Sequence, residues 1–91
     1  MINQLFELGE ILFTRGIREH FNNSDKPKEL LTRHVTGDFG DLDQEDINEN
    51  LYAIEKGDQR IFSAYNYESK KIYIITEWDR NHTIVMFEEE Y

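Results

Sequence analysis

The sequence of 91 residues contains no cysteine and a single proline. Without cysteine there are no disulfides, thiolate metal sites or cysteine nucleophiles, a composition typical of a protein in a reducing compartment. No apolar run approaches the roughly 18 residues that a membrane-spanning helix needs. The first ten residues carry no basic segment and no cleavage site of a secretory signal. We therefore expect a cytoplasmic protein that makes no contact with a membrane.

Positive charge is also scarce, with 10 Lys and Arg against 19 Asp and Glu, which gives a formal net charge of -9. Such a field repels phosphate backbones, so direct binding to DNA or RNA is disfavoured and a protein partner is favoured. Glycine-rich phosphate-binding motifs and nucleophile motifs are absent from the sequence. We predict no catalytic residues and no cofactor.

The three histidines, His20, His34 and His82, lie on different predicted elements without the spacing of metal ligands. No metal site is predicted from them. His34 follows the apolar pair Leu30 and Leu31 near the end of a predicted helix. There we expect it to pack and to form hydrogen bonds.

Few glycines, no repeats and no low-complexity segment indicate one domain over residues 1–91. A strand is expected at 10–13. Three helices are predicted from N-cap residues and apolar spacing: one after Thr14, one after Ser24 or Asp25 that ends near Gly37, and one after Asp43 that ends at Gly57. In the third helix Ile47, Leu51 and Ile54 recur at i, i+4 and i+7, so we expect them to face a sheet and to contact Ile72, Ile74 and Val85.

From residue 60 the apolar period changes to two, and turn residues separate three runs at 60–65, 71–76 and 83–87. These runs predict an antiparallel meander that the first strand joins. One face should pack on helices, and the other should carry tyrosines and polar groups. The expected fold is α+β, a two-layer domain of about three helices on an antiparallel sheet of three to four strands, in the order β-α-α-α-β-β-β.

An acidic segment is the strongest local feature, because no Lys or Arg occurs between Arg33 and Lys56. The acids in this segment are Asp38, Asp41, Asp43, Glu45, Asp46, Glu49 and Glu55. Helix capping explains Asp43, and the helix dipole favours acids in the first turn by about 0.3–1 kcal/mol each. The other acids form either a solvated face or a surface that imitates a phosphate backbone.

A calcium-binding loop fits the acidic segment poorly. With Asp38 as the first ligand, Gly40 and Leu42 occupy positions that require oxygen donors. With Asp41 first, Asp46 replaces the required glycine and Tyr52 the final glutamate.

A second group of acids surrounds the only tryptophan, between the second and third runs of the meander. Large aromatic side chains with a polar tip are enriched at interaction hot spots, so Trp78 is a candidate anchor. The predicted partner-binding residues are therefore Asp38, Asp41, Asp43, Glu45, Asp46, Glu49, Glu77, Trp78 and Asp79.

Two segments carry a resemblance to a known family. They read Arg-His-Val-Thr-Gly-Asp-Phe-Gly-Asp-Leu-Asp at 33–43 and Ile-Ile-Thr-Glu at 74–77, followed by Asp79 and Arg80. The chain from about residue 8 onward resembles short proteins of plasmids, phages and integrative elements, labelled plasmid-related proteins and sometimes type I restriction endonuclease subunit M. A single proline excludes the Asn-Pro-Pro motif of a methyltransferase. The resemblance implies a mobile-element context, in which small acidic proteins often inhibit host defence nucleases.

These observations favour a non-enzymatic interaction protein, an anti-CRISPR or anti-restriction inhibitor that acts as a DNA mimic on a basic nucleic-acid-binding channel. Two alternatives stay open. One is a metal-dependent enzyme whose carboxylates come from both acidic loops: Asp38, Asp41, Asp43, Glu77 and Asp79. The other is a self-associating accessory or regulatory protein, for which a homodimer is the simplest form.

Overall fold

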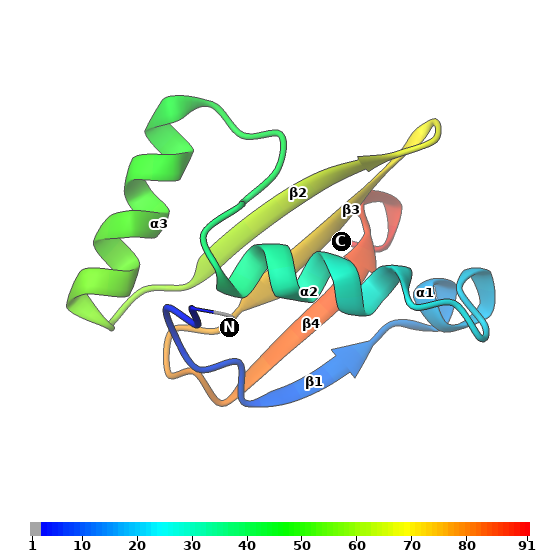
Figure 1. Ribbon diagram of the computed structural model, residues 1–91, viewed down its shortest axis with the longest axis horizontal. Coiled ribbons are helices and arrows are strands. Elements are labelled where there is room, and N and C mark those ends of the chain that lie inside the picture. Colours follow the sequence, from blue (N-terminus) through cyan, green and yellow to red (C-terminus); the bar gives the residue numbers. More distant parts are fainter. Residues whose placement is uncertain (1–2) are drawn as a thin grey trace.

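The computed structural model has the predicted order β-α-α-α-β-β-β and describes residues 3–91 (Figure 1). The first two residues of the predicted domain lie outside this range. The elements are β1 (Glu10–Phe13), α1 (Arg15–His20), α2 (Lys26–Val35), α3 (Gln44–Lys56), β2 (Ile61–Tyr67), β3 (Lys70–Thr76), β4 (His82–Phe87) and a short 3-10 helix, η1 (Glu88–Glu90). The α+β prediction is confirmed.

The four strands form one sheet in the order β1-β4-β3-β2. The meander is antiparallel as predicted, with Ser63 opposite Ile74 and Ile74 opposite Val85. β1 joins it as the fourth strand but runs parallel to β4, so the sheet is mixed. No hairpin links β1 to β4, since all three helices and two strands lie between them in the chain, and a parallel pair needs such a long connection.

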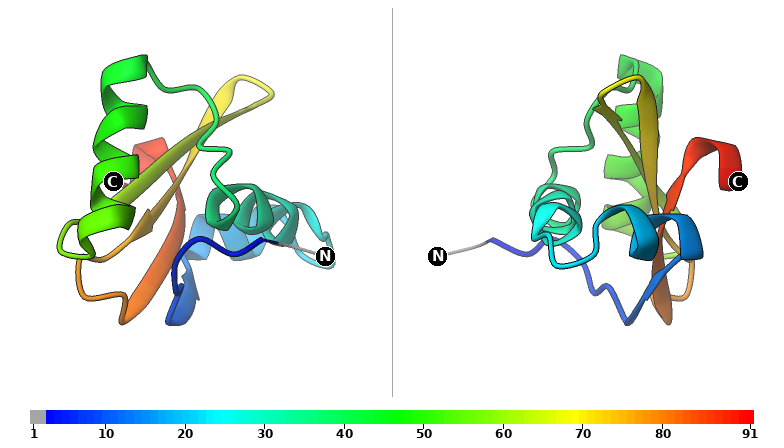
Figure 2. Two further views of the ribbon diagram at one scale, coloured as in Figure 1. Left: turned by 60° about the vertical axis from the view of Figure 1, so that its left-hand side comes forward. Right: turned by 90° about the vertical axis from the view of Figure 1, so that its right-hand side faces the viewer.

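The main core lies between α2 and one face of the sheet (Figure 2). Leu30 and Leu31 of α2 and Ile17 of α1 pack against Ile72 and Val85, all buried. The alternation predicted for β3 is confirmed on this face, where its even-numbered residues from Ile72 to Thr76 are fully buried. Burial of these side chains is the main source of stability for the domain.

The opposite face of the sheet is more apolar than predicted. Tyr73 lies there half-buried, as expected, but Ile75 and Met86 are buried on the same face, with Phe62 and Ile84 half-buried beside them. No helix lies across the middle of this face in Figure 2. The ring of Tyr73 contacts those of Phe62 and Tyr91, with centroids 4.7 and 5.9 Å apart.

The predicted helix ends are confirmed where capping chemistry is strong. Thr14 accepts a hydrogen bond from Ile17 N, and Asp43 accepts one from Asp46 N at 2.9 Å. α3 ends at Gly57, whose φ of 74° is the left-handed conformation that glycine adopts without strain.

The predicted core face of α3 is wrong. Leu51 is 49% exposed, and the buried residues of this helix are Asn50 and Ala53. Ile47 and Ile54 are half-buried, but they pack in a second cluster around Ile61, Val35 and Phe39 instead of against Ile72, Ile74 and Val85. The helix lies beside β2 rather than over the sheet, so its inward face is rotated toward Asn50 (Figure 1).

Candidate functional site

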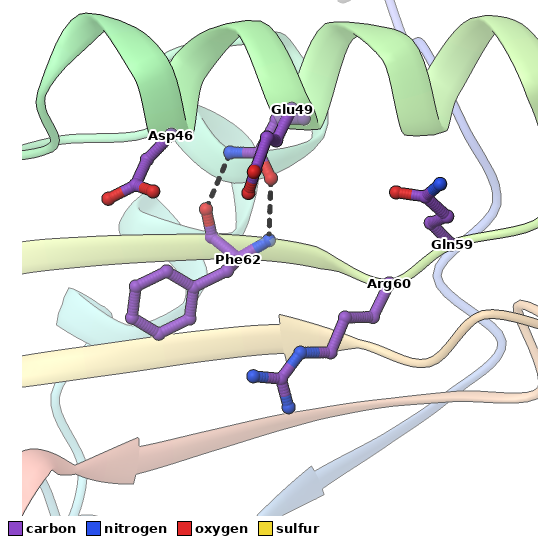
Figure 3. A pocket seen from close by; sticks show the side chains of 6 residues that line it. Asp46, Glu49, Gln59, Arg60 and Phe62 are labelled. Carbon is purple, nitrogen blue, oxygen red and sulfur yellow. Dashed lines mark hydrogen bonds between the residues drawn. The ribbon is translucent and has the colours of Figure 1, made fainter.

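The position of α3 is set by polar contacts with the outer edge of β2. Asn50 Nδ2 donates to Phe62 O at 2.7 Å, and Phe62 N donates to Asn50 Oδ1 at 3.0 Å, as the dashed lines in Figure 3 show. Farther along the same edge, Ala64 N donates to Phe39 O and Asp41 N donates to Ala64 O. One side chain and one loop therefore use backbone groups that would otherwise be open to another strand.

The loop that carries the first two predicted acids is held by ion pairs. Arg33 binds Asp38 through two hydrogen bonds of 2.7 and 3.3 Å, which lower the pKa of that carboxyl. The guanidinium also lies over the ring of Tyr65, 4.7 Å from its centroid. Asp41 accepts from Lys71 Nζ at 3.3 Å. These two acids are engaged within the chain, so they contribute less to the outward negative field than the sequence alone suggests.

Gly40 lies between these two acids and explains the close approach of the loop to β2. Its φ is 79°, and a Cβ at this position would collide with the backbone oxygen of Ala64. A side chain there would push the loop away from the strand. The segment 33–43 thus owes much of its residue pattern to structure.

The acids of α3 behave differently. Glu45, Asp46 and Glu49 are all exposed, and none of them forms an ion pair within residues 3–91. Together with Tyr52, which is 50% exposed, they form what we call the α3 surface. Asp43 lies at the N-terminal end of this surface as the cap of the helix.

A pocket of about 350 Å³ lies on the β2 side of the α3 surface (Figure 3). Asp46 and Glu49 come from α3, Phe62 comes from the start of β2, and Arg60 immediately precedes that strand. Arg60 extends away from the two carboxylates in Figure 3, and its Nη2 donates to Tyr91 Oη at 3.3 Å. The carboxylates are thus left open to a cation from outside.

The loop between β3 and β4 adjoins the other end of α3. Arg80 donates to Ala53 O at 2.9 Å and to Gln59 O at 2.5 Å, which ties this loop to the last turn of the helix. Trp78 is 60% exposed and Asp79 is exposed. The two stretches of predicted binding residues that remain open, α3 and the Trp78 loop, are therefore neighbours, with Glu77 half-buried at the end of β3.

His34 is fully buried in a chain of side-chain hydrogen bonds that crosses three strands. Its Nδ1 lies 2.5 Å from Ser63 Oγ and its Nε2 lies 2.9 Å from Thr76 Oγ1. Thr76 contacts Thr83 at 2.7 Å, and Thr83 donates to the backbone oxygen of Leu8.

The backbone oxygen of Leu8 can only accept, so it sets the direction of this chain. Thr83 donates to it, and the hydroxyl of Thr76 then donates to Thr83. Thr76 therefore accepts from His34 Nε2–H, which leaves Nδ1 to accept from Ser63. Burial keeps the imidazole neutral by lowering its pKa from 6.5 to about 3.

The expectation that His34 packs and forms hydrogen bonds is confirmed. The sequence analysis did not identify its hydrogen-bond partners, Ser63, Thr76 and Thr83. These residues are polar but occupy inward-facing positions of the strands, where the alternating pattern requires apolar residues, and this exception was the available signal. His34, Ser63, Thr76 and Thr83 are each less than 2% exposed. Their hydrogen-bond network therefore specifies how the core packs and offers no access to a substrate.

The carboxylates of the metal-enzyme alternative do not converge. Asp41 lies beside Lys71 in the early part of β3, whereas Glu77 and Asp79 follow its far end. Within residues 3–91, no three His, Asp or Glu side chains are grouped so that they could hold a metal ion. In the same range no helix is both long and apolar enough to span a bilayer. Comparison with known proteins finds no matching family model, curated protein or solved structure.

Proposed function

We propose that this chain is a non-enzymatic interaction protein that places its α3 surface in the basic nucleic-acid channel of a protein partner. The observation that carries the proposal is the contrast among the acids. Asp38 and Asp41, between α2 and α3, are bound to Arg33 and Lys71, whereas Glu45, Asp46 and Glu49 are exposed without an ion pair in the described residues. A cluster of carboxylates without nearby cations attracts a basic partner toward this surface and repels nucleic acid.

The α3 surface also has the composition of a protein interface. Tyr52 is a large, exposed aromatic residue of this surface, and Trp78 is another on the neighbouring loop that Arg80 joins to the last turn of α3. Aromatic anchors of this kind supply contact area at little cost in conformational entropy, and the surrounding charges supply orientation. A purely solvated acidic face needs no such aromatic residues.

The partner class follows from the family resemblance, which implies a mobile-element context. We infer a cytoplasmic defence nuclease, either a CRISPR effector or a restriction complex, that loses access to DNA while the acidic protein is bound. The protein then acts stoichiometrically as a DNA mimic. No covalent step and no cofactor enter this proposal.

The test is a DNA-cleavage assay with purified CRISPR effectors and restriction complexes, titrated with the protein at low and high salt. We expect inhibition that DNA competes away and that weakens as salt rises. The Glu45→Lys/Glu49→Lys variant should lose inhibition at low salt. Absence of inhibition of every such enzyme at low salt would contradict the proposal.

The matched control is Asp25→Lys/Glu68→Lys, which changes the net charge by the same amount. Both residues are exposed, and neither side chain forms an ion pair or hydrogen bond within residues 3–91. Asp25 stands at the N-terminus of α2, so its reversal carries a helix-dipole penalty like that of Glu45. Full inhibition by the control together with loss in the α3 variant would assign the effect to the α3 surface rather than to net charge.

A further inference from the structure

The two edges of the sheet are treated in opposite ways. The β2 edge is occupied by Asn50 and by the 39–41 loop, as described above. β1 forms the other edge, and in Figure 1 it is the border of the sheet, with β4 on one side only. Natural sheets commonly cover, shorten or charge such an edge, because an uncovered edge pairs with another strand.

The backbone of β1 directs alternate residues outward. Glu10 N and Thr14 N donate to Asn81 O and Val85 O on the β4 side. In a parallel ladder the backbone groups of alternate residues point to opposite sides, so Leu12 also faces β4, and Ile11 and Phe13 present their N–H and C=O groups at the open edge. The side chains of Ile11 and Leu12 are 40% and 38% exposed. β1 thus offers two donors, two acceptors and apolar contact area.

This set of groups is self-complementary. In an antiparallel pairing of two copies, Ile11 of each copy can lie opposite Phe13 of the other. Four inter-strand hydrogen bonds then form, two on each side of a two-fold axis. Leu12 then lies on the axis opposite its own copy, in a non-hydrogen-bonded pair, where side chains are closest. The two sheets become one sheet of eight strands.

Charge favours this edge over others for a protein with a net charge of -9. The acids of the α3 surface lie beyond β2, at the far side of the sheet from β1, and β1 itself carries one acid, Glu10. Pairing through β1 separates the two β2 strands by seven strand spacings, roughly 34 Å. The Debye length at physiological salt is about 8 Å, so the two acidic surfaces hardly repel one another.

We infer that β1 is a homodimerisation strand, through which two copies of this chain join their sheets edge to edge. The dimer presents its two α3 surfaces at opposite ends of the continuous sheet. This inference rests on the β1 edge alone and does not depend on what the α3 surface binds.

The sharpest test uses the absence of native cysteine. Leu12→Cys places one thiol on the proposed two-fold axis, at a Cα separation of about 4.5 Å, within the range of a disulfide. Glu10→Cys is the matched control on the same strand and face. In the same register its two copies are about 14 Å apart, too far for a disulfide. We expect Leu12→Cys to form the covalent dimer at least about tenfold faster than Glu10→Cys under mild oxidation.

Ile11→Pro provides a second test on the otherwise unmodified chain. Proline removes an N–H that points outward and leaves the ladder with β4 intact, since proline is tolerated on an edge strand. Ile11→Val keeps the N–H and serves as its control. By analytical ultracentrifugation from micromolar to millimolar protein, we expect the wild type and Ile11→Val to reach twice the single-chain mass of 11.0 kDa and Ile11→Pro to stay at that mass.

A wild type that stays monomeric throughout this range would overturn the inference. A dimer that survives Ile11→Pro, or equal cross-linking of the two cysteine variants, would also overturn it and would assign association to the open apolar face of the sheet. Circular dichroism of each variant verifies the fold. The cross-linking result decides the matter if Ile11→Pro does not fold.

Discussion

α2 and α3 are helices of similar design that serve the sheet in different ways. Both begin at an Asp and carry spaced apolar residues. α2 covers the centre of the sheet with Leu30 and Leu31, whereas α3 lies beside an edge and buries Asn50 and Ala53. The difference teaches that an apolar stripe predicts a helix reliably but does not predict what the helix packs against. The backbone groups of a sheet edge also need partners, and an amide side chain of a helix can supply them.

The same difference explains where the candidate surface lies. A helix over the sheet centre is buried along one whole side, but a helix beside an edge keeps most of its circumference in solvent. α3 can therefore carry exposed carboxylates and Tyr52 without disturbing the core. Its stability depends on a few contacts, which makes the two helices separable by mutation.

The largest expected effect is in the α2 core. Leu30 is 2% exposed, so Leu30→Ala leaves a cavity between the helix and the sheet. We expect the free energy of unfolding to fall by about 2–5 kcal/mol, measured by urea denaturation. A loss below about 1 kcal/mol would contradict the assignment of α2 as the helix that organises the core.

The second largest expected effect is a loss of stability in acid, through His34 of α2. The unfolded chain binds a proton at His34 below about pH 6.5, whereas the folded chain, in which burial lowers its pKa to about 3, does not. The free energy of unfolding therefore falls as the pH falls through this window, with a slope that approaches about 1.4 kcal/mol per unit, or about 2 kcal/mol in all from pH 7.5 to pH 5. The lowered pKa of Asp38 acts in the same direction at lower pH.

Urea denaturation as a function of pH measures this slope, and NMR of the imidazole nitrogens tests its cause. The folded protein should show a neutral ring protonated on Nε2 at pH 5. A charged ring at pH 5 would refute both the tautomer and the pH dependence.

The amide that holds α3 comes third. Asn50→Ala removes both hydrogen bonds to Phe62, whose backbone groups lie at a partly solvated edge. We expect a loss of about 1–2 kcal/mol in thermal or urea unfolding. Asn48→Ala is the control, because Asn48 is exposed and its side chain accepts a hydrogen bond from Gln44 of the same helix. It should change stability by less than about 0.5 kcal/mol.

The smallest expected effect is at Leu51. The helical spacing made it a core residue, but its side chain is 49% exposed. Leu51→Ala should shift the free energy of unfolding by no more than about 0.5 kcal/mol. A loss near that of Leu30→Ala would show that α3 covers the sheet in solution as the spacing predicted.

Much of the fold was predictable from local signals. The N-caps at Thr14 and Asp43, the stop at Gly57 and the period-two runs of the meander are all effects of near neighbours in the chain. The errors concern distant partners. The face of α3, the direction of β1 and the hydrogen bonds of His34 each depend on residues 12 or more positions apart in the sequence.

The candidate site likewise has features that the sequence predicted and features that depend on distant contacts. Sequence indicated an acidic protein with an exposed tryptophan, and Trp78 is exposed. It could not separate Asp38 and Asp41, which bind Arg33 and Lys71, from Glu45 and Glu49, which form no ion pair within residues 3–91. Lys71, the partner of Asp41, lies 30 residues away on β3.

The sequence by itself determined which segments form helices and strands and the sign of the protein's electric field, because both follow from propensity, capping and the count of charges. Only the tertiary structure decided which charges remain uncompensated, which sheet edge is covered and which is open. Those outcomes depend on contacts within a few ångströms between segments far apart in the chain, and no local pattern encodes them.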